Sequence, residues 1–201
     1  MAFDVEGKMQ TSDLRVQKTY MALTDAFTTL MEEMRFEEIT IGLLCERAMI
    51  RRTTFYKHFE DKNEFFRFYM ARIRDKFRSA VTGRDTPMGS YECETMMADE
   101  MMTFLSQHSG LMDNVLKSNV LGNLLWSFSD FIGESVIESL NAGNAREILC
   151  DIDKEMFAAF VSGGLVKMVL QWWTDGHKDE DREKIFAALG KLQAKLEGES
   201  C

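Results

Sequence analysis

The stretch 40–59 constrains the fold more than any other part of the chain, because two short helical patterns flank a tight corner there. Apolar residues recur at helical spacing from Ile41 to Ala48, and Thr40 precedes them in the position of an N-cap. The period breaks for two residues and then restarts, with Phe55 and Phe59 four residues apart on the side expected to be buried. The pattern predicts two helices joined by a corner.

The other side of the second helix is basic and polar. It has three fixed positive charges, three hydroxyl groups and one imidazole, but no carboxylate. The residues on this side are Arg51, Arg52, Thr53, Thr54, Tyr56, Lys57 and His58. Arg and Lys bind phosphates, and Arg can also bind the edge of a guanine through two hydrogen bonds. We interpret the stretch as a helix-turn-helix whose second helix enters the major groove of DNA. An ordinary helical hairpin with a basic surface is the alternative that periodicity alone leaves open.

Helical periodicity continues along the rest of the chain, and the composition agrees with an all-α fold. The sequence has one proline, Pro87, and few runs in which polar and β-branched residues alternate. The clearest break is 82–90, where Pro87 lies between two glycines. Outside the corner, helices are predicted over 13–34, 62–80, 91–107, 110–117, 120–141, 146–175 and 179–197. The chain is thus divided into a tail, 1–12, and two larger parts, 13–81 and 82–201.

The charge of the chain is unevenly distributed. The formal net charge is −9, which by itself argues against nucleic acid as a partner. Residues 13–80, however, hold 13 Lys and Arg against 11 Asp and Glu, whereas residues 81–201 hold 10 against 20. A chain with this division can bind DNA through its first part while its acidic second part stays away from the DNA.

No motif for a metal, a cofactor or a catalytic centre is present in the sequence. The four cysteines are widely spaced without a CxxC pair, and the three histidines are scattered. Neither a glycine-rich phosphate loop nor a Gly-x-Ser-x-Gly elbow occurs. We therefore expect no cofactor and no enzymatic activity. No signal core and no apolar run of roughly 20 residues were found, so a cytoplasmic protein without a membrane partner is expected.

The motif resembles the TetR family of bacterial transcriptional regulators. The resemblance rests on Thr40-Ile41, on Cys45-Glu46-Arg47-Ala48 and above all on Thr54-Phe55-Tyr56-Lys57-His58-Phe59, followed by Lys62. It covers about residues 13–70. It implies a three-helix DNA-binding domain over 13–81, joined by a long helix to a larger ligand-binding and dimerisation domain over 82–201. It also implies a homodimeric repressor that binds double-stranded DNA at a palindromic operator and is released by a small hydrophobic effector.

The resemblance assigns roles to individual residues. Arg52 and then Arg51 are the expected base readers at the start of the recognition helix, beside Thr53 and Thr54, although a plain phosphate contact is the alternative for either arginine. Phosphate contacts are expected from Tyr56, Lys57, His58, Lys62 and Thr40. Tyr56 can also pack on a thymine methyl group, a solvated side chain is the alternative for Lys57, and a simple N-cap is the alternative for Thr40. The family usually has glycine at the corner where this chain has Met49. A positive φ would strain methionine there, so either the corner avoids that conformation or the strain is tolerated.

The second part is expected to dimerise and to bind the effector. The helices over 146–175 and 179–197 are the candidates for the interface, with Phe160, Gly163, Gly164, Ile185, Leu189 and Leu192. The two glycines have an alternative role as a close packing contact within one subunit. Met101, Phe104, Leu125, Phe128, Met168 and Trp172 are the candidates for the pocket, with a plain hydrophobic core as the alternative.

A shorter segment is similar to one subgroup of the family. Phe160-Val161-Ser162-Gly163-Gly164-Leu165, followed by Gln171-Trp172-Trp173, resembles the penultimate helix of the regulators of dihydroxyacetone kinase operons. Such regulators can act as co-activators. The resemblance therefore leaves open a second function, in which the protein is an adaptor that responds to a partner protein instead of a small molecule.

Overall fold

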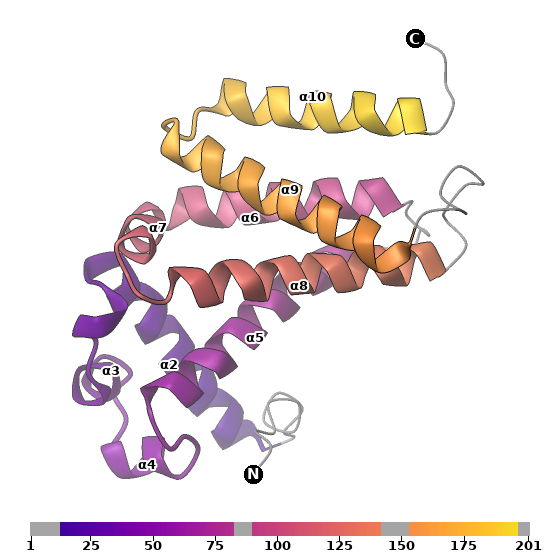
Figure 1. Ribbon diagram of the computed structural model, residues 1–201. Coiled ribbons are helices and arrows are strands. Elements are labelled where there is room, and N and C mark those ends of the chain that lie inside the picture. Colours follow the sequence, from indigo (N-terminus) through magenta and orange to yellow (C-terminus); the bar gives the residue numbers. More distant parts are fainter. Residues whose placement is uncertain (1–12, 83–89, 142–152, 197–201) are drawn as a thin grey trace. The chain divides into compact units, whose positions relative to one another are not determined.

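The computed structural model describes residues 13–82, 90–141 and 153–196, and these residues form helices without a strand. The chain begins with α2 (Leu14–Glu33), the short 3-10 helix η1 (Phe36–Glu38), α3 (Ile41–Arg47), α4 (Arg52–Tyr56) and α5 (Lys62–Thr82). It continues with α6 (Ser90–Gln107), α7 (Ser109–Leu116), α8 (Leu121–Ser139), α9 (Lys154–Thr174) and α10 (Asp179–Leu196) (Figure 1). The all-α prediction is confirmed.

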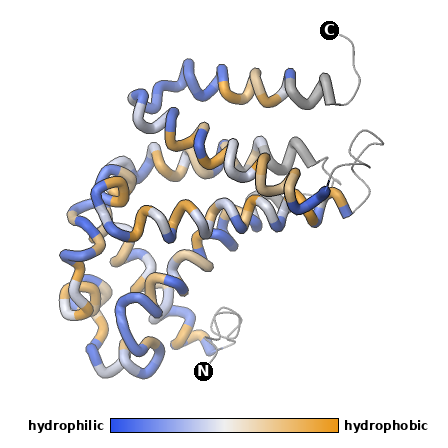
Figure 2. The backbone as a smooth tube through the Cα atoms, viewed as in Figure 1, coloured by the Kyte–Doolittle hydropathy of each residue, from blue (hydrophilic) through white to orange (hydrophobic). Residues whose placement is uncertain are grey.

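Several helix boundaries follow directly from capping residues. The Asp13 side chain accepts a hydrogen bond from the backbone N–H of Arg15 at 2.8 Å and starts α2. Asp153 does the same for α9, accepting from the N–H of Met156 at 2.8 Å. The predicted start of that helix at residue 146 falls in 142–152, outside the described residues. Apolar and polar positions alternate along the helices at helical spacing (Figure 2).

The chain packs into two compact units. The first comprises residues 1–76 and 107–124, so α2 to α4 and most of α5 pack together with α7. The second comprises residues 77–106 and 125–201. The domain boundary at residue 81 stays a prediction, and residues 107–124, which follow that boundary in the chain, pack with the first unit.

An aromatic cluster forms the core of the first unit. Phe27 of α2 is fully buried, and its ring centroid lies 5.3 Å from that of Phe65 and 4.8 Å from that of Tyr69. Phe36 of η1 packs against Phe27 at 6.2 Å and against Phe66 at 5.0 Å. Aromatic pairs at these distances stabilise a core beyond the area that they bury. The cluster holds η1 and α5 against α2.

α7 binds the C-terminal end of α2 through side-chain hydrogen bonds. The Asn114 Nδ2 group donates to the carbonyl oxygens of Met31 and Glu32, both at 3.0 Å. These carbonyls belong to the last turn of α2, where no helical N–H remains to bond them. A Cβ on Gly110 would lie 2.6 Å from the Glu32 carbonyl oxygen, so only glycine permits this approach. The helices α2 and α7 are therefore closely joined within the unit.

Glu37 of η1 binds the start of α8. Its carboxylate accepts from the Ser118 hydroxyl at 2.9 Å and from the backbone N–H of Asn119 at 2.6 Å. The Asn119 N–H is the largest cause that lowers the pKa of Glu37 below its usual value. Together with the α7 contacts, this bond explains why residues 107–124 pack with the first unit.

The second unit combines an apolar interior with one partly buried ion pair. Phe77, in the last part of α5, packs against Phe104 of α6 at 5.8 Å and against Phe128 of α8 at 5.9 Å between ring centroids. Arg182 of α10 donates to Asp99 of α6 at 2.5 Å and to the Thr103 hydroxyl at 2.7 Å. The ion pair and the hydrogen bond to Thr103 thus hold α10 against α6.

One described helix, α9, is long and apolar enough by length and composition to cross a membrane, and 33% of that stretch is buried. Lys154, Glu155 and Lys167 interrupt this stretch, so it is not the continuous apolar run whose absence was noted in the sequence. Core helices of soluble proteins meet the same criterion, so the observation is weak evidence for a membrane span. Trp172 and Trp173 at its C-terminal end are buried within the unit.

Candidate DNA-binding and ligand sites

Two buried phenylalanines fix the orientation of α4. Phe55 and Phe59 are 0% and 1% exposed, as predicted, and their ring centroids are 5.4 Å apart. The Phe59 ring also contacts that of Phe65 at 5.2 Å, which joins α4 to the aromatic cluster. The helix begins where the N–H groups of Thr54 and Phe55 bond to the Arg51 carbonyl, at 2.8 and 3.2 Å. A helix this short is held by its anchors more than by its own hydrogen bonds.

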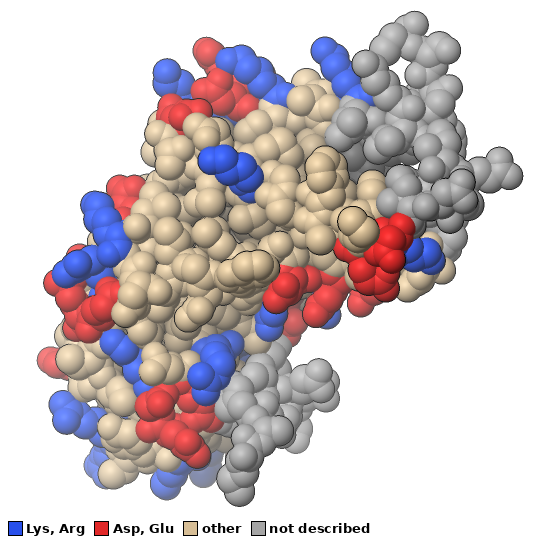
Figure 3. All heavy atoms as spheres, in the orientation of Figure 1, with Lys and Arg blue, Asp and Glu red and all other residues tan. Residues whose placement is uncertain are grey.

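The side of α4 opposite these anchors faces outward. Arg51, Arg52, Thr53, Tyr56 and Lys57 are exposed, and Thr54 and His58 are partly exposed. Figure 3 shows basic side chains along the lower edge of the molecule, where Figure 1 places α3 and α4. The structure therefore brings the predicted DNA-binding residues of α4 onto one surface that is open to a ligand.

Tyr20 of α2, which the sequence did not single out, lies against His58. Its hydroxyl is 3.3 Å from the His58 Nδ1 atom, and the two rings meet edge to face at 5.2 Å. Burial, together with the charge of Glu64, raises the pKa of Tyr20, so the phenol is neutral at physiological pH. Tyr20 thus orients the imidazole that follows the end of α4. Apolar spacing places Tyr20 in the core but does not reveal this contact.

Thr40 is an N-cap in the structure. Its hydroxyl oxygen accepts from the backbone N–H of Leu43 at 3.1 Å, at the start of α3. This contact confirms the capping role, while a phosphate contact by the same residue remains a prediction.

Gly42 and Cys45 follow on α3. Cys45 is buried, and burial raises the pKa of its thiol.

Lys62 begins α5 as expected, but its ammonium group points into the protein. The Nζ atom donates to the carbonyl oxygens of Phe36 at 2.7 Å and Ile39 at 2.8 Å, and it lies 4.2 Å from the centre of the Phe36 ring. Burial lowers the pKa of this lysine. The ammonium group therefore stabilises the η1 turn, and a phosphate contact would have to compete with these bonds.

Replacing Lys62 by methionine is expected to weaken the fold more than DNA binding. The two carbonyl groups lose their partner, which costs about 1–3 kcal/mol of unfolding free energy. The salt dependence of DNA binding should stay unchanged. Lys57→Met is the matched control on the exposed face, and loss of its phosphate contact should reduce the slope of log K against log salt by about 0.9 per lysine. A similar reduction for Lys62→Met would show that Lys62 binds phosphate.

Met49 has a left-handed conformation, which decides between the two possibilities that the sequence left open for the corner. Its φ is 53°, and its side chain is 92% exposed. The N–H groups of Met49 and Ile50 bond to the carbonyls of Glu46 and Cys45, at 3.0 and 2.9 Å. These two bonds form a Schellman motif at the end of α3, which requires a positive φ at this position. The strain is therefore tolerated because the motif satisfies two helix-end carbonyls.

Replacing Met49 by glycine is expected to stabilise the protein. Release of the left-handed strain outweighs the greater freedom of glycine in the unfolded chain, for a net gain of about 0.5–1 kcal/mol. Because the side chain is exposed, little packing is lost. Urea denaturation measures the unfolding free energy of Met49→Gly and of the control Met49→Ala. Alanine keeps the left-handed strain, so the control should be no more stable than the wild type. Equal stability of the two variants would contradict the argument.

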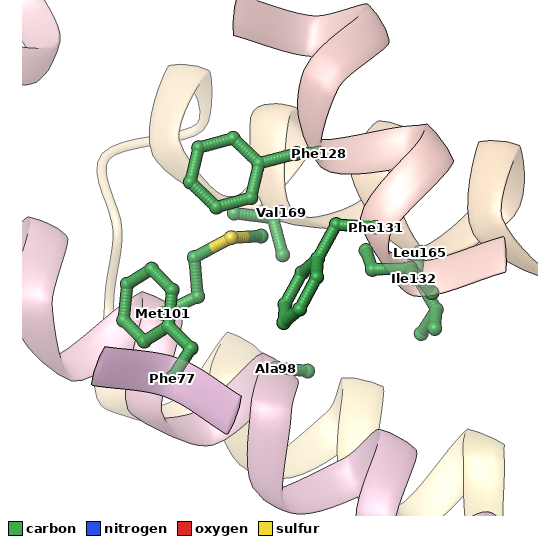
Figure 4. A pocket seen from close by; sticks show the side chains of 8 residues that line it. All are labelled: Phe77, Ala98, Met101, Phe128, Phe131, Ile132, Leu165 and Val169. Atoms are coloured by element: carbon green, nitrogen blue, oxygen red, sulfur yellow. The ribbon is translucent and has the colours of Figure 1, made fainter. Parts of the chain in front are cut away.

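The second unit contains a small apolar cavity. Its volume is about 10 Å³, which is about the space of one water molecule. Figure 4 shows side chains from α5, α6, α8 and α9 around it. They are Phe77, Ala98, Met101, Phe128, Phe131, Ile132, Leu165 and Val169. A drug-sized ligand would have to displace these side chains to enter.

The predicted pocket residues divide between this cavity and its surroundings. Met101 and Phe128 line the cavity. Phe104 is not part of the lining, but its ring contacts that of the lining residue Phe77. Leu125, Met168 and Trp172 lie outside the lining, and the Trp172 indole donates to the Lys178 carbonyl at 3.0 Å, in the turn before α10. The sequence missed most of the lining because helical spacing identifies buried faces but not the faces that meet.

The predicted interface residues on α9 are open to solvent in the single chain. Phe160 is 77% exposed, and a Cβ on Gly163 or Gly164 would meet nothing within 4 Å. The glycines are therefore not needed for packing within one subunit. Ile185 and Leu189 of α10 are half-buried, and the side chain of Leu192 lies outside the described residues. Figure 3 shows a broad uncharged surface over α8 and α9.

Comparison with known families decides the identity of the second part. A TetR-type family model described as "Transcriptional regulator C-terminal region" matches residues 95–193. The chain belongs to the TetR family of transcriptional regulators. Among curated proteins no match is found.

Solved structures of TetR-family regulators share the fold of this chain. A TetR-family transcriptional regulator from Syntrophomonas wolfei aligns with a TM-score of 0.69 and 14% identity, over 88% of this chain and 95% of that chain. The dihydroxyacetone kinase operon activator DhaS aligns with a TM-score of 0.62 and 16% identity, over 89% and 96%. FadR from Bacillus subtilis, in complex with stearoyl-CoA, aligns with a TM-score of 0.60 and 15% identity, over 90% and 100%. At these identities the likeness shows the fold alone.

Proposed function

We propose that this TetR-family regulator binds a palindromic DNA operator as a homodimer, represses transcription in the cytoplasm, and is released by a small hydrophobic effector. The observation that carries the proposal is the outward face of α4. Phe55 and Phe59 hold its apolar side in the core, so Arg51, Arg52 and Lys57 project from the opposite side. No carboxylate lies on α4 itself. Such a face suits a groove bordered by phosphates.

Dimerisation through α9 would give two recognition helices. The exposed apolar side chains Met156 and Phe160 lie four residues apart, hence on one side of the helix, at 73% and 77% exposure. Gly163 and Gly164 follow on that side and would allow a second helix to approach closely. Burial of such a surface is favourable when a partner covers it. The two recognition helices of a dimer should lie roughly 34–36 Å apart, one turn of DNA.

The effector is proposed to enter the apolar cavity of the second unit. All eight lining residues are apolar, so the part of a ligand that lies there must be apolar as well. Arg78 lies beside one of the lining residues, with its guanidinium 5.2 Å from the centre of the Phe131 ring. Its ion pair with Glu134 is long, at 3.7 Å, and the two side chains are 43% and 63% exposed, so the pair contributes little. An anionic end group could exchange with Glu134 there.

The test combines DNA, assembly and ligand measurements on the full chain. Footprinting with its own promoter region at low salt should show protection of a palindrome, and scattering measurements should give twice the mass of 23.2 kDa. Met156→Glu should yield a monomer that no longer protects the site. Met21→Glu is the matched control, because Met21 is an exposed methionine on α2. Failure of the wild type to protect any palindrome would contradict the proposal.

A second function is favoured by two observations. Trp126 of α8 is 73% exposed, which is unusual for tryptophan on a free surface, and the cavity is too small for a ligand without rearrangement. An adaptor that responds to a partner protein would use such a surface. A thermal-shift screen separates the two functions. If alkyl carboxylates raise the melting temperature of the wild type but not of Ala98→Trp, the protein responds to a small-molecule effector. If only a co-purified protein raises it, and Trp126→Ala abolishes that increase, the protein is an adaptor.

A further inference from the structure

Gly42, in the first turn of α3, lies directly beneath the guanidinium group of Arg52. A Cβ built on Gly42 would be 2.1 Å from the Arg52 Nη2 atom, 2.9 Å from its Cζ atom and 3.3 Å from its Nε atom. Carbon atoms of side chains do not approach other atoms so closely. The guanidinium therefore occupies the space that any other residue at position 42 would fill.

A second observation places Arg52 along the same face of α3. Cys45 follows Gly42 by three residues, so the two lie on one side of the helix. The positive charge of Arg52 acts on the buried Cys45 thiol and lowers its pKa, against the larger effect of burial, which raises it. Arg52 is nevertheless exposed to solvent. Its guanidinium is thus oriented by α3 and remains accessible from outside.

We infer that Gly42 is a positioning residue for DNA binding, because it orients the guanidinium of Arg52. The inference rests on the proposed DNA-binding function of α4. An unrestrained arginine side chain has many rotamers, and it loses this freedom when it binds a base or a phosphate. Contact with the bare Cα of Gly42 removes part of that freedom before DNA arrives.

The first arm of the test measures DNA affinity for Gly42→Ala, Arg52→Ala and the double variant. Gly42→Ala should weaken operator binding about tenfold, which is a smaller loss than the one expected for Arg52→Ala. In the Arg52→Ala background the same change should alter affinity less than twofold, because no guanidinium remains to displace. Gly122→Ala is the matched control, since Gly122 is also the second residue of its helix and a Cβ there meets nothing within 4 Å.

The second arm needs no DNA. Nitrogen relaxation of the Arg52 Nε–H group should show a restrained side chain in the wild type and a mobile one in Gly42→Ala, at unchanged or higher melting temperature. A mobile Arg52 in the wild type would overturn the inference. So would wild-type operator affinity for Gly42→Ala, or an equal loss in both backgrounds, which would place Gly42 itself against the DNA backbone. If Arg52 is restrained but the wild type binds no operator, the proposed function fails and the positioning contact stands.

Discussion

Replacing Arg52 by alanine is expected to abolish specific operator binding while leaving the fold intact. Arg52 is exposed at the start of α4, and an arginine that reads a guanine contributes about 1–3 kcal/mol per recognition helix, or roughly 10–100-fold in affinity. In a dimer the loss occurs at both half-sites. Competitive binding assays with operator and unrelated DNA measure the change. The loss should be much larger for the operator.

Arg35→Ala is the control for charge alone. Arg35 lies in the same unit, and its exposed pair with Glu38 contributes little to stability. Its removal should leave operator specificity unchanged. If Arg52→Ala weakens binding to operator and unrelated DNA equally, Arg52 contacts phosphate and the base is read elsewhere, with Arg51 as the next candidate.

Replacing Phe27 by alanine is expected to cause the largest loss of stability, about 3–5 kcal/mol. Phe27 is 0% exposed and its ring contacts those of Phe36, Phe65, Phe66 and Tyr69. Removal leaves a cavity between α2, η1 and α5, the three elements that support the DNA-binding helices. Urea denaturation monitored by circular dichroism measures the loss.

Met21→Ala on the same helix is the control for the Phe27 prediction. Met21 is 54% exposed, so its truncation should change the unfolding free energy by no more than about 0.5 kcal/mol. A loss below about 1 kcal/mol for Phe27→Ala would show that the aromatic cluster repacks around the missing ring.

The sequence predicted local features that depend on neighbouring residues. The cap at Thr40 and the buried pair Phe55 and Phe59 follow from residues within about one helical turn of each other. The sequence also identified Met49 as the residue in question at the corner, but only the structure showed its positive φ. Helical periodicity also identified nearly every helix, because a repeat of 3.6 residues is visible in the chain itself. For Lys62 the neighbouring residues did not predict where its ammonium group binds. The carbonyls that its ammonium binds belong to η1, 26 and 23 residues earlier in the chain.

The sequence by itself thus determined the family, the helices and the outward face of α4, because each is encoded in short-range spacing and in the types of residue exposed. Only the tertiary structure decided which faces meet. It placed α7 against α2 through Asn114, assembled the cavity from helices distant in the chain, and brought the Arg52 guanidinium over Gly42. These contacts depend on side-chain packing between separate helices, and spacing along one helix carries no information about its partner.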